Sequence, residues 1–449
     1  MPIGEVRTQR GSPFSARTPS PRGHPLPVEA LQDLLGGLPR ERGPRPGAGP
    51  RLSSPVVGGG VDKRAMAALS SGHLATDLAQ GALPALLPFL VVKFDLSYAL
   101  AAALVLAGTI SSSVVQPAFG LWSDAKGALW LLPVGVAVSG TGMAAAAIAP
   151  SYSLVVLAVL VSGLGVAAYH PEGSKFASYV SGRRRASGMA LFSIGGNVGF
   201  ALGPLVASTA VLALGLEGGL VLAVPGLLVA TMLLAVRPYL ARFSPDVGAG
   251  GKQALAPSES RGMALLLVVI GLRSVAHMGL FTFVPLWEVA KGHGAAYGTM
   301  LLSLFLFAGA LGTLAGGPLA DRFGRRRVLL SSFSAAAPLI FVYVAVGGVV
   351  GAVALTLSGA VVIGTFGITL VMSQEYVPAR VGMASGLSIG LAIGLGGVAA
   401  LSLGAVADAV DLETALYFTA AGPAAAVVLT LLLPPARRPL AAEAAPATL

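Results

Sequence analysis

The sequence predicts an all-α membrane protein with twelve transmembrane helices, arranged as two parallel repeats of six helices. Of its 449 residues, 55% are hydrophobic and only 11% are charged, whereas soluble domains contain roughly 25% charged residues. The mean hydropathy is +0.81. From residue 66 onward, apolar runs of about 20 residues or more alternate with short polar segments, which is the length that a helix needs to cross a bilayer. A match between the two halves of the chain indicates the repeat.

The apolar runs are continuous rather than alternating, which excludes a transmembrane β-barrel. In lipid a backbone must satisfy its own hydrogen bonds, so each run is expected to be a helix. The expected spans are residues 66–92, 98–121, 128–149, 153–178, 187–213, 218–236, 263–288, 296–319, 328–347, 350–374, 382–407 and 412–433.

The segments outside the spans divide the chain. Residues 1–62 are rich in Arg, Pro, Gly and Ser and contain no apolar core of a signal peptide, so a disordered cytoplasmic tail is expected. Translation starting near Met66 and an organelle transit peptide are alternatives, and the acidic residues of the tail count against the second. Two six-helix halves follow at 63–236 and 262–435, joined by a cytoplasmic linker at 237–261, and a second cytoplasmic tail covers 436–449.

Basic residues predict the orientation of the helices. The loops that follow odd-numbered spans carry only Lys93 and Lys291. The other loops carry many more basic residues, namely Lys126, Arg183 to Arg185, Arg237, Arg242, Lys252, Arg261, Arg322, Arg325 to Arg327 and Arg380. By the positive-inside rule both termini and the loops that follow even-numbered spans lie in the cytoplasm. The net charge of +10 therefore marks the inner membrane face, and nucleic acid is not an expected partner.

A shift of 197 residues aligns the two halves of the chain. Identical residues then coincide at Pro88 and Pro285, Gly120 and Gly317, Asp124 and Asp321, Gly127 and Gly324, Tyr179 and Tyr376, and Arg183 and Arg380. Six helices followed by six more in the same orientation form a parallel repeat, which places a substrate site between the halves near the middle of the membrane.

Two loops give a more specific indication of the family. Residues 120–127 (GLWSDAKG) and 317–327 (GPLADRFGRRR) resemble the signature loop of the major facilitator superfamily. Within that family, residues 72–81 (GHLATDLAQG), 116–117 (QP), 170–173 (HPEG) and 195–204 (GGNVGFALGP) resemble the fosmidomycin-resistance branch. The resemblance covers residues 66 to 434 and implies a proton-driven exporter of the inner membrane, with phosphonates related to fosmidomycin as substrates.

Ionisable side chains within the spans are candidate sites, because charge in the bilayer is costly unless it faces water or a partner. Asp77 lies near the middle of the first span with His73 one turn away, and desolvation of its carboxylate suits a proton carrier. Residues 169–204 hold a second group of ionisable side chains, His170, Glu172 and Lys175. Glu172 is a second candidate for proton coupling, although its spacing to Lys175 also permits a simple ion pair.

Arg273 and His277, one turn apart in the seventh span, are the main candidates for substrate binding. A guanidinium stays charged and offers a planar fork for phosphonate or carboxylate oxygens. The alternative is that Arg273 is the counter-ion of Asp77. His73, Asn197 and Gln116 are lesser candidates for the substrate site.

Further residues are expected to gate the transporter and pack its helices. Asp124, Asp321, Arg183 and Arg380 lie at cytoplasmic helix ends, where ion pairs bias a two-state equilibrium, although the arginines also serve topology. Gly195, Gly199, Gly203 and Pro204 form a small-residue stripe that lets helices approach closely.

Together with the resemblance, the pattern predicts a secondary transporter that exports a small anionic or amphiphilic compound in exchange for protons, acting as a monomer in the lipid bilayer. A proton-coupled importer of an organic anion and a non-transporting receptor are the alternatives. The sequence has no cysteine, no zinc-binding spacing of histidines and no nucleotide-binding loop. No metal, cofactor or enzymatic activity is therefore expected.

Overall fold

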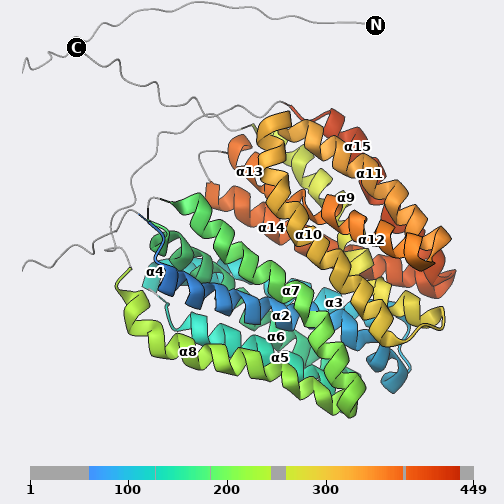
Figure 1. Ribbon diagram of the computed structural model, residues 1–449, viewed down its shortest axis with the longest axis horizontal. Helices are drawn as coiled ribbons and strands as arrows, with labels where there is room; N and C mark the ends of the chain where they lie inside the picture. Colours follow the sequence, from blue (N-terminus) through green and yellow to red (C-terminus); the bar gives the residue numbers. More distant parts are fainter. Residues whose placement is uncertain (1–59, 127, 183, 244–258, 378–380, 435–449) are drawn as a thin grey trace, which may run out of the picture. The chain divides into compact units, whose positions relative to one another are not determined.

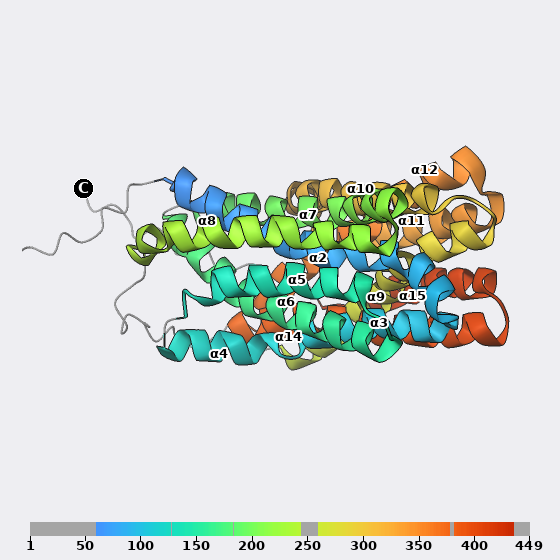
Figure 2. The same cartoon turned by 90° about the horizontal axis from the view of Figure 1, so that it is seen from below.

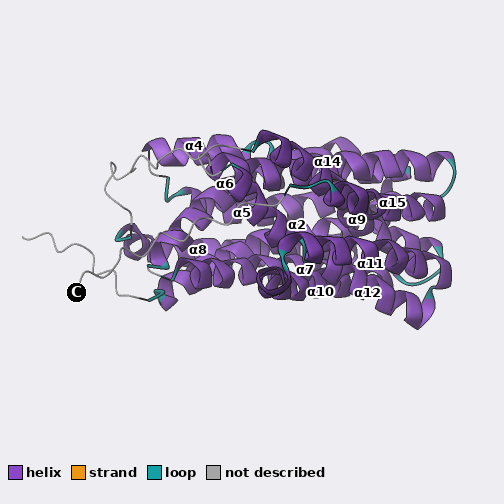
Figure 3. Ribbon diagram, turned by 90° about the horizontal axis from the view of Figure 1, so that it is seen from above, coloured by secondary structure: helices purple, strands orange, loops and turns teal. Residues whose placement is uncertain are grey.

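A computed structural model describes residues 60–126, 128–182, 184–243, 259–377 and 381–434. Within these residues every regular element is helical, as Figure 3 shows. The first half contains α2 (Lys63–Phe94), α3 (Tyr98–Ser113), α4 (Gln116–Lys126), α5 (Leu131–Ile148), α6 (Tyr152–Val180), α7 (Arg185–Leu214), the 3-10 helix η1 (Gly215–Leu222) and α8 (Ala223–Ala241). The second contains α9 (Ser260–Ala290), α10 (Ala295–Phe323), α11 (Arg325–Val346), α12 (Gly348–Ile363), α13 (Phe366–Tyr376), α14 (Val381–Ala409) and α15 (Leu412–Leu431).

The twelve-helix fold is confirmed. In the described residues, 11 segments are long and apolar enough to cross a membrane, and one of them, Ser187–Ala241, has 55 residues. That segment contains α7, η1 and α8 and therefore supplies two crossings. The fifth and sixth predicted spans thus form one continuous helical run that turns through η1.

Two predicted spans differ from the structure because each is broken. The second consists of α3 and α4, and the tenth consists of α12 and α13. Pro117 lies in the first turn of α4. Amides in the first turn of a helix have no hydrogen-bond partner within the helix, so proline, which lacks the amide hydrogen, is tolerated there. Gly364 lies at the second break, where a residue without a side chain weakens the helix.

The repeat has a structural counterpart at the ends of the two halves. The Asp62 amide donates to the carbonyl of Val180 at 2.8 Å, and the Glu259 amide donates to the carbonyl of Tyr376 at 2.7 Å. The donors are 197 residues apart and the acceptors are 196 residues apart, so an equivalent contact precedes the first helix of each half. We call this end of the helices the inner end and the opposite one the outer end, following the predicted orientation. Figure 2 shows the helices running side by side between these two ends.

Close packing of α7 on α2 positions the candidate site. Glycines four residues apart on α7 lie against the backbone of α2, which runs beside α7 in Figure 1. A Cβ atom at Gly195, Gly199 or Gly203 would meet the carbonyl oxygen of Ser70, Leu74 or Leu78, respectively. Pro204 follows within α7. Small residues of this kind drive helix association in lipid, where no hydrophobic effect brings helices together.

Candidate functional site

The carboxylate of Asp77 lies between two imidazoles. His73 Nε2 is 3.3 Å from Asp77 Oδ2, and His170 Nε2 is 3.1 Å from Asp77 Oδ1. His73 and Asp77 lie on successive turns of α2, while His170 comes from α6. The side chain of Asp77 is 14% exposed. We call these three residues the Asp77 cluster.

Backbone carbonyls fix the hydrogen positions on both imidazoles. His73 Nδ1 is 2.9 Å from the Phe192 carbonyl oxygen, and His170 Nδ1 is 2.9 Å from that of Val166. A carbonyl oxygen only accepts, so each Nδ1 is assigned the hydrogen, and each Nε2 of a neutral ring presents a lone pair. A lone pair facing an ionised carboxylate is repelled. Each contact between Nε2 and Asp77 therefore becomes attractive when an additional proton lies between the nitrogen and the carboxylate oxygen.

Neighbouring aromatic rings and a glycine hold the cluster in place. The rings of His73 and Phe192 stack with centroids 4.2 Å apart, and those of His73 and His170 meet edge to face at 5.0 Å. Gly196 of α7 leaves no space for a side chain, because a Cβ atom there would meet His73 and Asp77. The cluster is thus enclosed by α2, α6 and α7.

The same residues bear on the expectation that no metal is bound. In the described part of the chain they are the one group of His, Asp and Glu side chains whose donor atoms, all within 4.8 Å of one another, could hold a metal ion. Three side chains are fewer than the four ligands of a closed structural zinc site, but they equal the three protein ligands of an open one. Both imidazoles also contact the carboxylate directly, and these contacts need no ion between them.

Glu172 belongs to a separate group on the other side of α6. Its side chain is 1% exposed, and Lys175 Nζ is 2.7 Å from its Oε2. The Ser123 hydroxyl donates to Glu172 and accepts from Lys175, which ties α6 to α4. These contacts favour the ion-pair alternative for Glu172 over a role in proton coupling.

Arg273 is buried without a carboxylate partner among the described residues. Its side chain is 2% exposed, its Cζ lies 5.3 Å from the centre of the Phe366 ring, and its Nε has no hydrogen-bond partner. His277 lies one turn along α9, and its Nε2 also has none. The proposed pairing of Arg273 with Asp77 is not formed, because Asp77 contacts the two histidines. An uncompensated buried cation is costly, so this position favours an anion.

Comparisons with known proteins identify the family. The model of the Major Facilitator Superfamily matches residues 69–401. The chain is 33% identical over 373 residues to the uncharacterized MFS-type transporter YfnC of Bacillus subtilis (strain 168), covering 80% of this chain and 90% of that protein. The chain belongs to the major facilitator superfamily.

A second relative and two solved structures agree with this assignment to the major facilitator superfamily. The transporter is 31% identical over 378 residues to the fosmidomycin resistance protein of Escherichia coli (strain K12), covering 82% of this chain and 92% of that protein. A bacterial homolog of the human lysosomal transporter Spinster, in an inward-facing conformation, matches with a TM-score of 0.68 at 13% identity, covering 82% and 96% of the two chains. The nucleoside transporter NupG matches with a TM-score of 0.67 at 15% identity, covering 82% and 99%. The predicted resemblance to this superfamily and to its fosmidomycin-resistance branch is confirmed.

The remaining predicted residues of the transporter lie elsewhere along the helices or outside the described residues. Asn197 follows Gly196 in α7 and Gln116 begins α4, and both are half-buried. Asp321 is exposed near the end of α10. Of the other gating residues, Arg183 and Arg380 lie outside the described residues. Asp124 belongs to α4, but its side chain is not among those that the structure describes.

The structure adds contacts that the sequence did not predict. At the inner end Arg325 pairs with Glu375. At the outer end Asp408 of α14 accepts hydrogen bonds from the amides of Tyr98 at 2.7 Å and Ala99 at 3.0 Å. Asp408 therefore links the first turn of α3 to the second half of the transporter. Its acidic side chain at the end of a predicted span was the available signal.

Proposed function

We propose that this transporter is a proton-driven exporter of a small anionic or amphiphilic compound. The observation that carries the proposal is the position of Asp77 between two imidazoles inside a membrane helix. Ionisable groups within transmembrane segments are typical of proton pathways.

The hydrogen-bond pattern supports a role in proton coupling. With each Nδ1 hydrogen donated to a backbone carbonyl, the two contacts between Nε2 and Asp77 are the places where protons can be gained or lost. Each proton gained raises the formal charge of the cluster by one. A change of charge in a low-dielectric surrounding alters the energy of the conformation that holds it, and alternating access can use that difference.

Arg273 supports an anionic substrate. Its buried guanidinium has no carboxylate partner among the described residues, and His277 adds a second polar group one turn away. A phosphonate or carboxylate would supply the missing counter-charge through a bidentate contact. The fosmidomycin resistance protein is a relative at 31% identity, which makes fosmidomycin the first compound to test. His73, Asn197 and Gln116 stay candidates for contacts with the rest of the substrate.

The wider assignment follows from these roles. We propose an inner-membrane location, cytoplasmic termini, a monomer, and gating by Asp124, Asp321, Arg183 and Arg380 at the inner end. Glu172 stays a secondary candidate for proton coupling.

Reconstitution into liposomes tests the function directly. The full chain is purified, inserted into vesicles that contain a pH-sensitive dye, and exposed to fosmidomycin. We expect substrate and protons to move in opposite directions, and an imposed proton gradient to accelerate substrate movement. Substrate flux without proton movement would refute proton coupling. Movement of both in the same direction would instead support the proton-coupled importer.

A further inference from the structure

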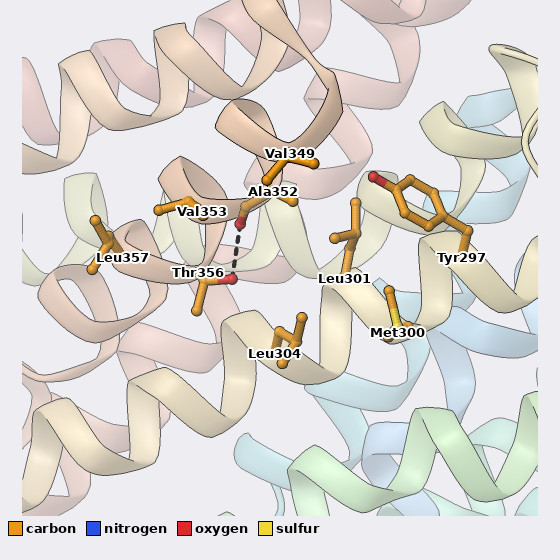
Figure 4. A pocket seen from close by; sticks show the side chains of 9 residues that line it. All are labelled: Tyr297, Met300, Leu301, Leu304, Val349, Ala352, Val353, Thr356 and Leu357. Atoms are coloured by element: carbon orange, nitrogen blue, oxygen red, sulfur yellow. Dashed lines mark hydrogen bonds between the residues drawn. The ribbon is translucent and has the colours of Figure 1, made fainter.

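An apolar groove lies between α10 and α12 (Figure 4), and its lining includes neither Arg273 nor a residue of the Asp77 cluster. Its volume is about 380 Å³. The residues that line it are Tyr297, Met300, Leu301, Leu304, Val349, Ala352, Val353, Thr356 and Leu357. From Tyr297 to Leu304 and from Val349 to Leu357 the two helices advance by about 10–12 Å, so the groove extends about two turns from the outer end toward the middle of the membrane. We call it the α10–α12 groove.

The lining of the groove is almost entirely apolar. The Thr356 hydroxyl donates to the Ala352 carbonyl oxygen at 2.8 Å and is therefore satisfied within α12. The other polar side chain, Tyr297, stands at one end of the row in Figure 4. Apolar side chains on both sides are exposed, Val349 by 82% and Leu304 by 42%. Because α10 and α12 belong to candidate membrane spans, these side chains meet hydrocarbon in the bilayer.

A cation lies where the groove begins. The Lys291 ammonium is 3.0 Å from the position that a Cβ atom would take at Gly347, the residue before α12. The same ammonium lies 5.2 Å from the centre of the Trp287 ring, and Lys291 is exposed. The start of a helix also carries a partial positive charge. The outer end of the groove therefore favours an anion.

The acidic side chain three residues before Lys291 is already engaged. Glu288 is buried and accepts a hydrogen bond from the Tyr343 hydroxyl at 2.8 Å, and its other oxygen is 2.6 Å from His293 Nδ1. Among the described residues Lys291 takes part in no ion pair with a carboxylate. The charge of Lys291 thus stays available to a ligand from the membrane.

We propose that the α10–α12 groove binds a phospholipid with an anionic headgroup, whose phosphate contacts Lys291 and whose acyl chain lies along the groove. The length, apolar walls and membrane exposure of the groove match one segment of an acyl chain. Moving an acyl chain from the surrounding lipid into the groove gains little free energy from the hydrophobic effect, because the lipid is as apolar as the groove. Selectivity among lipids therefore depends on the charge at Lys291 and on the shape of the groove.

Native mass spectrometry of the full chain, purified in mild detergent, tests the proposal. The protein is mixed with equal amounts of phosphatidylglycerol and phosphatidylcholine that carry the same acyl chains. We expect the wild type to retain phosphatidylglycerol about fivefold better, the preference that one basic residue near a lipid surface produces. Equal retention of the two lipids by the wild type would overturn the proposal.

Paired variants locate the site. Lys291→Gln should lose the preference for phosphatidylglycerol, whereas Lys93→Gln should keep it, because the ammonium of Lys93 at the outer end of α2 donates to the Ala149 carbonyl oxygen at 2.7 Å.

A second pair of variants tests the groove itself. Ala352→Trp should fill the groove and reduce retention of both lipids, whereas Val224→Trp, on the exposed face of α8, should not. If Ala352→Trp does not fold, Val353→Phe replaces it. Unchanged retention in Lys291→Gln, or equal losses in a variant and its control, would refute this site.

Discussion

The two halves of the transporter share one helical plan but carry opposite chemistry at equivalent positions. Under the shift of 197 residues, Asp77 of α2 corresponds to Ser274 of α9, and Arg273 of α9 corresponds to Thr76 of α2. The first half therefore holds an acid where the second holds a hydroxyl, and the second holds a base where the first holds a hydroxyl.

The surroundings of the two groups differ in the same way. His170, which contacts Asp77, corresponds to Gly367 in the second half. A Cβ atom at Gly367 would have no neighbour within 4 Å, and Gly367 follows Phe366, whose ring lies against Arg273. The acid is thus enclosed by protein partners, whereas the base has no such partner among the described residues. The difference is consistent with a division of labour in which one half handles protons and the other handles the substrate.

The largest expected effect comes from removing the acid. Asp77→Asn should reduce proton-driven transport at least about a hundredfold, the order expected when a proton-transferring side chain is lost. Transport is measured in vesicles with an imposed pH gradient. Moving the carboxylate to the second half, with Asp77→Ser and Ser274→Asp together, should not restore it, because Gly367 supplies no imidazole.

Glu172→Gln is the control, since it removes a buried carboxylate of the same half that pairs with Lys175. It should leave coupling intact while lowering thermal stability through the loss of the ion pair with Lys175. Normal transport by Asp77→Asn, or an equal loss of coupling in the two variants, would contradict the assignment of the proton site to the Asp77 cluster.

Removing the base should have the second largest effect. Arg273→Gln should weaken the binding of fosmidomycin by roughly tenfold to a hundredfold, the usual effect of losing charge-assisted hydrogen bonds. Arg273→Lys should retain part of that affinity, because lysine keeps the charge without the planar fork. Affinity is measured on purified protein with fosmidomycin and, in parallel, with a cationic dye. Equal losses for both ligands would show that Arg273 has a structural role and would remove the contrast between the halves.

A smaller effect is expected where the two halves meet at the outer end. Asp408→Ala removes the acceptor of the Tyr98 and Ala99 amides, a change comparable to losing a helix cap, and should shift the equilibrium toward opening of this end by about fivefold. The chain has no cysteine, so Thr109→Cys in the buried face of α3 would give a unique label. The rate of its modification by an aqueous thiol reagent should rise about fivefold in the Asp408→Ala background.

Asp411→Ala provides the control for that experiment. Asp411 accepts a hydrogen bond from the Thr414 amide at 2.6 Å, which caps α15 within the second half. That hydrogen bond lowers the pKa of Asp411 below its ordinary value, so its contribution is present at neutral pH and is lost only as the pH falls into the acid range. Asp411→Ala should leave the labelling rate unchanged. An equal increase in both variants would indicate loosening of the outer end in general.

The sequence predicted local features better than contacts between distant helices. The span expected at 153–178 is α6, Tyr152–Val180, because hydropathy and helix length depend on neighbouring residues alone. The pair of His73 and Asp77 was also predictable, since residues four apart share a helix face.

Contacts between helices were less predictable. Asp77 meets His170 across 93 residues of sequence, and that contact depends on how α6 packs against α2. For the same reason the sequence could not decide between the alternatives for Arg273, and in the structure the Asp77 carboxylate contacts the two histidines. The acceptor role of Asp408 likewise depends on the packing of α14 beside α3.

The glycine stripe of α7 has a consequence for the proton role that we propose for the Asp77 cluster. The backbones of α7 and α2 are in direct contact, without flexible side chains between them that could rearrange. The two helices should therefore move as a single rigid body. Phe192 on α7, and His73 and Asp77 on α2, then travel together, so the distances among these three residues stay nearly constant through the transport cycle. What can vary is the position of His170, which lies on α6, and the access of water to the cluster. Movement of α6 and hydration would then decide when a proton is taken up and when it is released.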